Sequence, residues 1–228
     1  MATGQTRQCR RGTRVDDVSV IDRQATALLR PALAVLARGL VRAGVRADAL
    51  TFAALGVGWA AAFAIAVDAR WLGATGIVVS RLLDGLDGAV ARQTQPTDRG
   101  GFLDISLDFL FYPAVPLAFA VAHPAANALP AAVLLAAFVS TGTSFLAFAV
   151  LAAKRGLVST AYPEKSFYFL GGLTEATETL AFFLAMCAWP EHFAALAYAF
   201  AALCAVTIAT RLRWGWLAFR PGVEEDGT

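Results

Sequence analysis

The sequence predicts an all-α integral membrane protein with six transmembrane helices, an amphipathic interfacial helix before them, and both termini in the cytoplasm. Composition is the first reason: the 228 residues are 58% hydrophobic and 16% charged, whereas a soluble domain carries about 25% charged residues. The second is that apolar stretches near the ~20 residues that cross a bilayer recur after residue 47. The third is that Lys and Arg gather in alternate loops, as cytoplasmic loops require.

The N-terminal region divides into a polar tail and a helix. Residues 1–18 contain four arginines and no apolar core, which predicts a disordered tail and argues against a cleavable signal peptide. In residues 19–46, leucines recur at helical spacing among arginines. This pattern predicts an amphipathic juxtamembrane helix on lipid headgroups, and the alternative is a helix packed on a soluble partner. Pro31 should weaken or kink it.

Six apolar spans form one predicted domain, residues 47–213, followed by a cytoplasmic tail, residues 214–228. The expected spans are approximately 49–67, 71–91, 103–122, 128–152, 167–188 and 193–211. If the N-terminus is inside, seventeen Lys and Arg fall in inner segments and one in outer loops, which favours six spans. Arg81 lies within the second span. A net charge of +2 without a basic stripe argues against a nucleic-acid partner.

Four aspartates interrupt the apolar pattern, at Asp84, Asp87, Asp104 and Asp108. An ionisable group at the bilayer centre costs about 2.5–3.5 kcal/mol, so such groups must be neutralised. Asp84 and Asp87 are three residues apart and share one helix face, and the other two are four apart and share a face of the next helix. A short loop makes these helices antiparallel neighbours, so two pairs of carboxylates should face each other. The alternative is aspartates that cap helix ends in water.

The composition of this cluster predicts a metal site beside a phosphate site. Carboxylates without a histidine or cysteine set suit Mg²⁺ or Mn²⁺, and four of them allow two ions. Gly88 and Ala91 present almost no side chain on the face of Asp84, so a flat ligand can approach the backbone. Arg92 lies further along the same face, and its guanidinium can donate paired hydrogen bonds to a phosphate. Gly100 frees the first amides of the third span, and helix packing is the alternative for each glycine.

The pattern Asp84-x2-Asp87-Gly88-x2-Ala91-Arg92-x7-Gly100-x3-Asp104-x3-Asp108 resembles the signature of the CDP-alcohol phosphotransferases, also called CDP-alcohol phosphatidyltransferases. Every fixed position is filled over 25 residues. A Pro-Asn-x2-Thr-like element of the family is kept only in part, as Asp48 and Thr51 without the proline. Residues 140–179 are similar to an uncharacterised bacterial branch of the family, notably at 165–168 and 171–175.

The resemblance implies a phospholipid-synthesis enzyme that transfers a phosphatidyl group from CDP-diacylglycerol to an alcohol and releases CMP. Headgroup transfer from a CDP-alcohol to diacylglycerol is the main alternative within the family. The resemblance also implies a homodimer in the bacterial inner (cytoplasmic) membrane, with its active site at the cytoplasmic face. It implies that Asp84, Asp87 and Asp104 are metal ligands and that Asp108 is both a metal ligand and the general base. The residues that it assigns to the CDP site are Asp84, Gly88, Ala91, Arg92, Gly100 and Thr51.

Candidate acceptor-binding residues lie in and before the fifth span. Glu175 and Glu178 are acids within an apolar segment, where such groups are functional candidates; bracing the helix bundle is the alternative. Lys154, Arg155 and Lys165 flank the preceding loop and can bind a phosphate on the acceptor, with positive-inside anchoring as the alternative. The sequence does not identify the acceptor alcohol.

Proteins of other classes also place acids in membranes. An ion-coupled transporter is expected to have charges near mid-membrane and inverted repeats, whereas these aspartates gather at one face and no repeat is visible. A membrane prenyltransferase should have more spans and two well-separated aspartate motifs. A catalytically dead scaffold would have no need of an intact motif.

Overall fold

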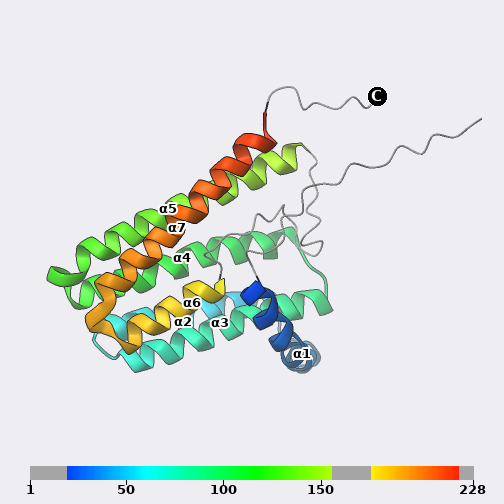
Figure 1. Ribbon diagram of the computed structural model, residues 1–228. Coiled ribbons are helices and arrows are strands. Elements are labelled where there is room, and N and C mark those ends of the chain that lie inside the picture. The colour runs from blue at the N-terminus through cyan, green and yellow to red at the C-terminus, as the bar shows by residue number, and fades with distance from the viewer. Residues whose placement is uncertain (1–19, 156–175, 221–228) are drawn as a thin grey trace, which may run out of the picture.

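The computed structural model describes residues 20–155 and 176–220, and within these ranges it is entirely helical (Figure 1). The elements in chain order are α1 (Val20–Arg42), α2 (Ala47–Ala66), α3 (Arg70–Gln93), α4 (Asp98–Ala122), α5 (Pro124–Lys154), α6 (Ala176–Ala188), the 3-10 helix η1 (Pro190–His192) and α7 (Phe193–Ala218). The predicted tails, residues 1–18 and most of 214–228, lie outside the described residues. The all-helical expectation is confirmed for the described chain.

Four helical stretches are long and apolar enough to cross a membrane: Ala47–Ala66, Asp98–Ala122, Pro124–Lys154 and Pro190–Ala218. They agree with four of the six predicted spans and indicate a multi-pass membrane protein. The described part of α6 is apolar but shorter, and the rest of its predicted span falls among residues 156–175, outside the described residues. α3 carries the charged residues of the motif and is not one of the four. The count of six spans and the cytoplasmic termini therefore stay predictions.

Close approach of α2 and α3 positions the charged helix. A Cβ at Gly76 would lie 2.7 Å from the Cβ of Ala61, so only small residues permit the two backbones to approach so closely. Further along, the Ser80 hydroxyl donates a hydrogen bond of 2.7 Å to the carbonyl of Ala54. These contacts run antiparallel along the pair and hold the N-terminal half of α3 against α2.

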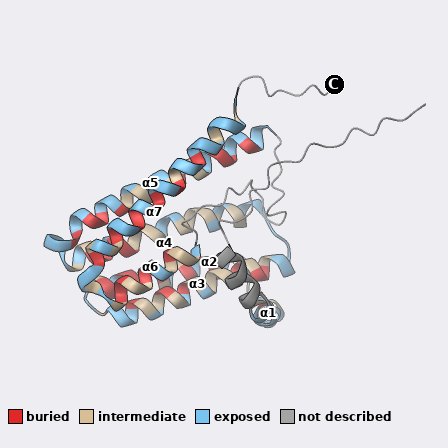
Figure 2. Ribbon diagram, viewed as in Figure 1, coloured by how far each residue is buried: buried red, intermediate tan, exposed pale blue. Residues whose placement is uncertain are grey.

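An aromatic core joins α4, α5, α6 and α7. Phe183 lies edge-on to Phe111 and Phe138, with ring centroids 6.5 and 6.2 Å apart, and Phe138 meets Phe200 at 5.6 Å. Figure 2 shows that the buried positions line the facing sides of the helices while the outer faces are exposed. Large apolar side chains such as Phe63, at 69% exposure, lie on those outer faces, as expected of a surface in contact with lipid.

A helix is present where the amphipathic one was predicted, as α1, and it is continuous across Pro31; its place on lipid headgroups stays a prediction. A Cβ at Gly85 would lie 3.3 Å from a methyl carbon of Leu33, and Gln93 donates a hydrogen bond of 3.0 Å to the carbonyl of Ala34. α1 therefore lies against the C-terminal half of α3, at the end of the bundle where α3 passes into α4 (Figure 1). We call this end the aspartate end.

Candidate active site at the turn between α3 and α4

Three of the four predicted aspartates meet at the aspartate end. Asp84, Asp104 and Asp108 each offer one carboxylate oxygen, and these oxygens all lie within 4.8 Å of one another. Asp84 comes from the second half of α3, and the other two come from the first half of α4. The turn between the helices is short because Thr97 caps α4, its Oγ1 accepting a hydrogen bond of 3.0 Å from the amide of Gly100. Carboxylates of the two helices thus lie close together, as predicted, for these three residues.

The fourth aspartate, Asp87, is not in that group of three and is more deeply buried, at 5% exposure. Thr51 on α2, itself buried, lies against the Asp87 carboxylate. Among the described residues, the Oδ2 atom of Asp87 has no hydrogen-bond partner. A buried carboxylate oxygen without a partner is costly, and a cation would remove that cost. Together with the oxygen-only donors of the neighbouring group, it fits Mg²⁺ or Mn²⁺.

Arg81 also belongs to the site, and sequence reasoning missed it. Its Nη1 lies 2.7 Å from Oδ1 of Asp108 and 3.5 Å from Oδ2 of Asp84. The guanidinium carbon lies 4.0 Å from the centroid of the Phe111 ring. The sequence placed Arg81 only within the second span and gave it no partner among the aspartates. Arg81 lies three residues before Asp84 on α3, and this spacing was the one feature of the sequence that could have indicated an ion pair between them.

The glycine and arginine that follow the first aspartates lie together. A Cβ at Gly88 would be 3.3 Å from Nη1 of Arg92, so the Arg92 side chain folds back over the Gly88 backbone. Arg92 is exposed near the end of α3, and Ala91 is half-buried beside it. Gly88 and Ala91 therefore add little side chain to the face of α3 beyond Asp84, and Arg92 places a cation over it; its use by a phosphate-bearing ligand stays a prediction.

Two helix N-termini, those of α2 and α4, meet beside the aspartates. Asp48 in the first turn of α2 forms an ion pair with Arg99 in the first turn of α4. A Cβ at Gly100 would lie 3.9 Å from Oδ1 of Asp48. Both N-termini bring positive dipole ends to the same place, although the Gly100 amide, which the sequence predicted to be available, is bonded to Thr97. Such ends favour anions, so the region suits a diphosphate as well as the cations that would accompany it.

Comparison with known proteins gives the family. A family model described as CDP-alcohol phosphatidyltransferase matches residues 45–210. The chain belongs to this family. It is also 46% identical, over 201 residues, to the inner membrane protein YnjF of Escherichia coli (strain K12), a match that covers 88% of this chain and 98% of that protein.

Solved structures share the fold of this chain. The phosphatidylinositol phosphate synthase PgsA1 of Mycobacterium tuberculosis with CDP-DAG bound superposes with a TM-score of 0.67 at 22% identity, over 86% of this chain and 98% of that one. The same enzyme in complex with manganese and citrate gives a TM-score of 0.65 at 23% identity, over 86% and 93% of the two chains. At this level of identity the likeness establishes the fold.

The structure places the candidate acceptor residues only in part. Lys154 ends α5 and is exposed. Arg155 donates a hydrogen bond of 3.3 Å to the carbonyl of Ala218 and lies 5.3 Å from the centroid of the Phe219 ring. It therefore ties the end of α5 to the end of α7, which is a structural role that the sequence did not indicate. Glu178 is half-buried in the first turn of α6. The other two candidates, Lys165 and Glu175, lie outside the described residues.

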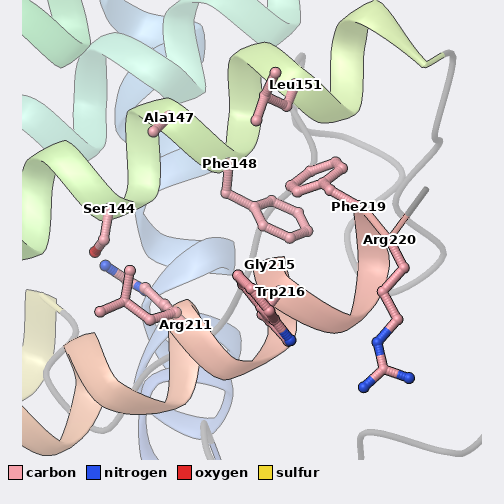
Figure 3. Close-up of a pocket in the computed structure, with 10 residues that line it drawn as sticks. Ser144, Ala147, Phe148, Leu151, Arg211, Gly215, Trp216, Phe219 and Arg220 are labelled. Atoms are coloured by element: carbon pink, nitrogen blue, oxygen red, sulfur yellow. The ribbon is translucent and has the colours of Figure 1, made fainter.

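A cavity of about 490 Å³ lies between α5 and α7 (Figure 3). Arg211, only 7% exposed, lines it and donates a hydrogen bond of 3.1 Å to the carbonyl of Thr141. Figure 3 shows Ser144 beside Arg211, with the rings of Phe148 and Phe219 facing each other further along. Nothing in the sequence indicates that the Arg211 side chain is buried, so sequence reasoning did not identify this cavity.

Proposed function

We propose that this protein is a divalent-metal-dependent phosphatidyltransferase. It transfers the phosphatidyl group of a CDP-diacylglycerol-like lipid to an alcohol and releases CMP. The observation that carries the proposal is the cluster of Asp84, Asp104 and Asp108 oxygens within 4.8 Å, beside the buried Asp87. The family of the chain supports it, as do the structures of PgsA1 with CDP-DAG and with manganese.

The four aspartates would hold Mg²⁺ or Mn²⁺, and their number allows two ions. When bound, the metal neutralises the diphosphate and stabilises charge on the leaving CMP phosphate. Asp84, Asp87 and Asp104 would act as ligands alone, and Asp108 would act as ligand and base. Since Asp87 is buried against Thr51, it fixes the inner side of the site while the exposed Asp104 leaves an opening for substrate.

The nucleotide would lie along the flat face of α3. Gly88 and Ala91 leave room for the diphosphate to approach the backbone, and Arg92 can swing from its position over Gly88 to form a fork of hydrogen bonds with phosphate. The N-termini of α2 and α4, near Thr51 and Gly100, add dipoles that favour the same negative charge. The lipid tails would remain in the bilayer beside the helices.

Asp108 would take the proton of the acceptor alcohol. As the alcohol oxygen attacks the phosphorus of the phosphatidyl group, its O–H proton passes to the Asp108 carboxylate, and the bond from that phosphorus to the CMP oxygen breaks. An alcohol is too weakly acidic to attack unaided, so a positioned carboxylate is required. The acceptor is proposed to contact Lys154 and Glu178, together with Lys165 and Glu175. A panel of alcohols tested as acceptors would identify it.

The test is CMP release from CDP-diacylglycerol by purified protein with Mn²⁺ and a panel of alcohols. We expect Asp108→Asn to lower kcat by about 10²–10⁴-fold while binding of CDP-diacylglycerol persists. Asp98→Asn is the matched control, because Asp98 is an exposed acid on the same helix. Retained turnover in Asp108→Asn would remove Asp108 from the base role.

The same assay separates the two directions of transfer. CMP released from a CDP-alcohol in the presence of diacylglycerol, and not from CDP-diacylglycerol, would assign headgroup transfer instead. In either direction we propose a homodimer in the bacterial inner membrane, with the aspartate end at the cytoplasmic face. The name of the Escherichia coli relative supports the inner membrane.

A further inference from the structure

The carboxylate site already contains a cation of the protein itself. The guanidinium of Arg81 lies 2.7 Å from Asp108 and 3.5 Å from Asp84, so it bridges α3 and α4. These are two of the three residues whose oxygens form the candidate metal group. The Arg81 side chain is 13% exposed, and ion pairs with so little water around them are screened far less than surface pairs.

Contacts on the side away from the aspartates hold this guanidinium in place. It stacks over the Phe111 ring at 4.0 Å, and its Nη2 donates a hydrogen bond of 3.3 Å to the Ser80 hydroxyl. That hydroxyl is in turn fixed by its hydrogen bond to Ala54 on α2. Because the planar guanidinium combines ring stacking with directional donors, these contacts favour one position of the Arg81 side chain.

We propose that Arg81 is a built-in cation of the aspartate site, which positions Asp108 for proton transfer and competes with the divalent metal for Asp84 and Asp108. The inference rests on the proposed function for the role of Asp108, but not for the competition. A guanidinium and a divalent ion that share two carboxylates repel each other. Arg81 therefore lowers the affinity for metal while it keeps an Asp108 oxygen oriented by a charge-assisted hydrogen bond.

Removal of Arg81 should change metal affinity and turnover in opposite directions. Without the guanidinium, the metal binds to the acids with no competing charge, so its affinity rises. Asp108 at the same time loses the partner that orients it, so the chemical step slows. A residue that only braces the fold would lower both properties together, because a loosened site binds metal less well and reacts less well.

The experiment compares Arg81→Met, Arg81→Gln and Arg81→Lys with the wild-type protein. Arg70→Gln is the matched control, since Arg70 is an exposed arginine at the opposite end of the same helix. Mn²⁺ binding is measured without substrate, from the electron paramagnetic resonance signal of the free ion. We expect the two neutral variants to bind Mn²⁺ about tenfold more tightly, as removal of one nearby charge implies. Arg81→Lys should lie between them and the wild type, because it keeps the charge but not the fork.

Turnover is the second measurement. We expect kcat for CMP release in Arg81→Met to fall about 10²-fold, within the range of a disturbed general base, with KM for the CDP-lipid changed less than about threefold. Monodisperse elution in detergent checks that each variant is folded. Weaker or unchanged Mn²⁺ binding, unchanged kcat, or failure of both neutral variants to fold would overturn the proposal. If the wild type releases no CMP with any substrate pair, the proposed function fails, while the Mn²⁺ titration still decides the competition.

Discussion

Gly58 on α2 is the position at which a single added methyl group should do most harm to the site. A Cβ there would lie 2.4 Å from Cδ2 and 2.8 Å from Cε2 of Phe111, and 3.0 Å from the Ser80 hydroxyl. Phe111 is the ring under the Arg81 guanidinium and is 1% exposed. Gly58→Ala therefore pushes on both groups that hold Arg81 in place.

The expected cost follows from the packing. Two non-bonded carbons normally lie about 3.5–4.0 Å apart, so the Phe111 ring must retreat by roughly 1 Å into a close-packed interior. Overpacking of this kind costs about 1–3 kcal/mol. Gly56→Ala is the matched control on the same helix, because a Cβ at Gly56 meets nothing within 4 Å. Both variants gain the same helix-propensity term of about 0.5–1 kcal/mol, which cancels in the comparison.

The assay is thermal unfolding of purified protein in detergent micelles, followed by loss of the monodisperse peak in size-exclusion chromatography. Since 1 kcal/mol corresponds to about 2–4 °C in a chain of 150–250 residues, we expect the Tm of Gly58→Ala to lie several degrees below that of Gly56→Ala. CMP release should fall in Gly58→Ala alone. Equal Tm values for the two variants would refute the packing of α2 against the Phe111 ring and, with it, the support beneath Arg81.

Two further predictions concern binding of the substrates. Gly88→Ala should leave Tm within about 1 °C of the wild type, because its Cβ would touch only the movable end of Arg92, but KM for the CDP-lipid should rise about tenfold as the flat face is lost; an unchanged KM would place the nucleotide elsewhere. Lys154→Gln should raise KM for the acceptor several-fold without loss of stability, whereas Arg155→Gln should lower Tm because it removes the tie to Ala218. Steady-state kinetics and thermal unfolding of the two variants test these separate roles of Lys154 and Arg155. If Lys154→Gln leaves KM for the acceptor unchanged, Lys154 does not contact the acceptor.

The core of the site could be predicted because it depends on local geometry. Helical periodicity puts Asp104 and Asp108 on one face, and the short turn after α3 brings Asp84 beside them, so spacing alone was sufficient. The position of Arg81 could not be predicted in the same way. Its partner Asp108 lies 27 residues away. The orientation of the guanidinium also depends on stacking against the Phe111 ring of α4, and the distance between the two helices at this point cannot be derived from residue spacing.

The spans show a similar division. Uniformly apolar segments such as α2 and α5 were predicted from hydropathy, since burial in lipid and burial in protein demand the same side chains. Residues 71–91 were also predicted as a span, but the motif charges lower the hydropathy of α3, so its crossing of the membrane stays a prediction while its packing along α2 gives its place in the bundle. The buried Arg211 was missed for a related reason: a basic residue near a helix end looks the same in sequence whether it faces water or a cavity.

The attachment of α1 to α3 has a consequence for where catalysis occurs. Leu33 and Ala34 contact α3 at Gly85 and Gln93, the first of which directly follows a catalytic-site aspartate. An amphipathic helix settles at the boundary between headgroups and acyl chains. We therefore expect α1 to fix the depth of the aspartates at the level of the phosphates of neighbouring lipids, so that a lipid substrate would reach them by lateral diffusion without leaving its leaflet.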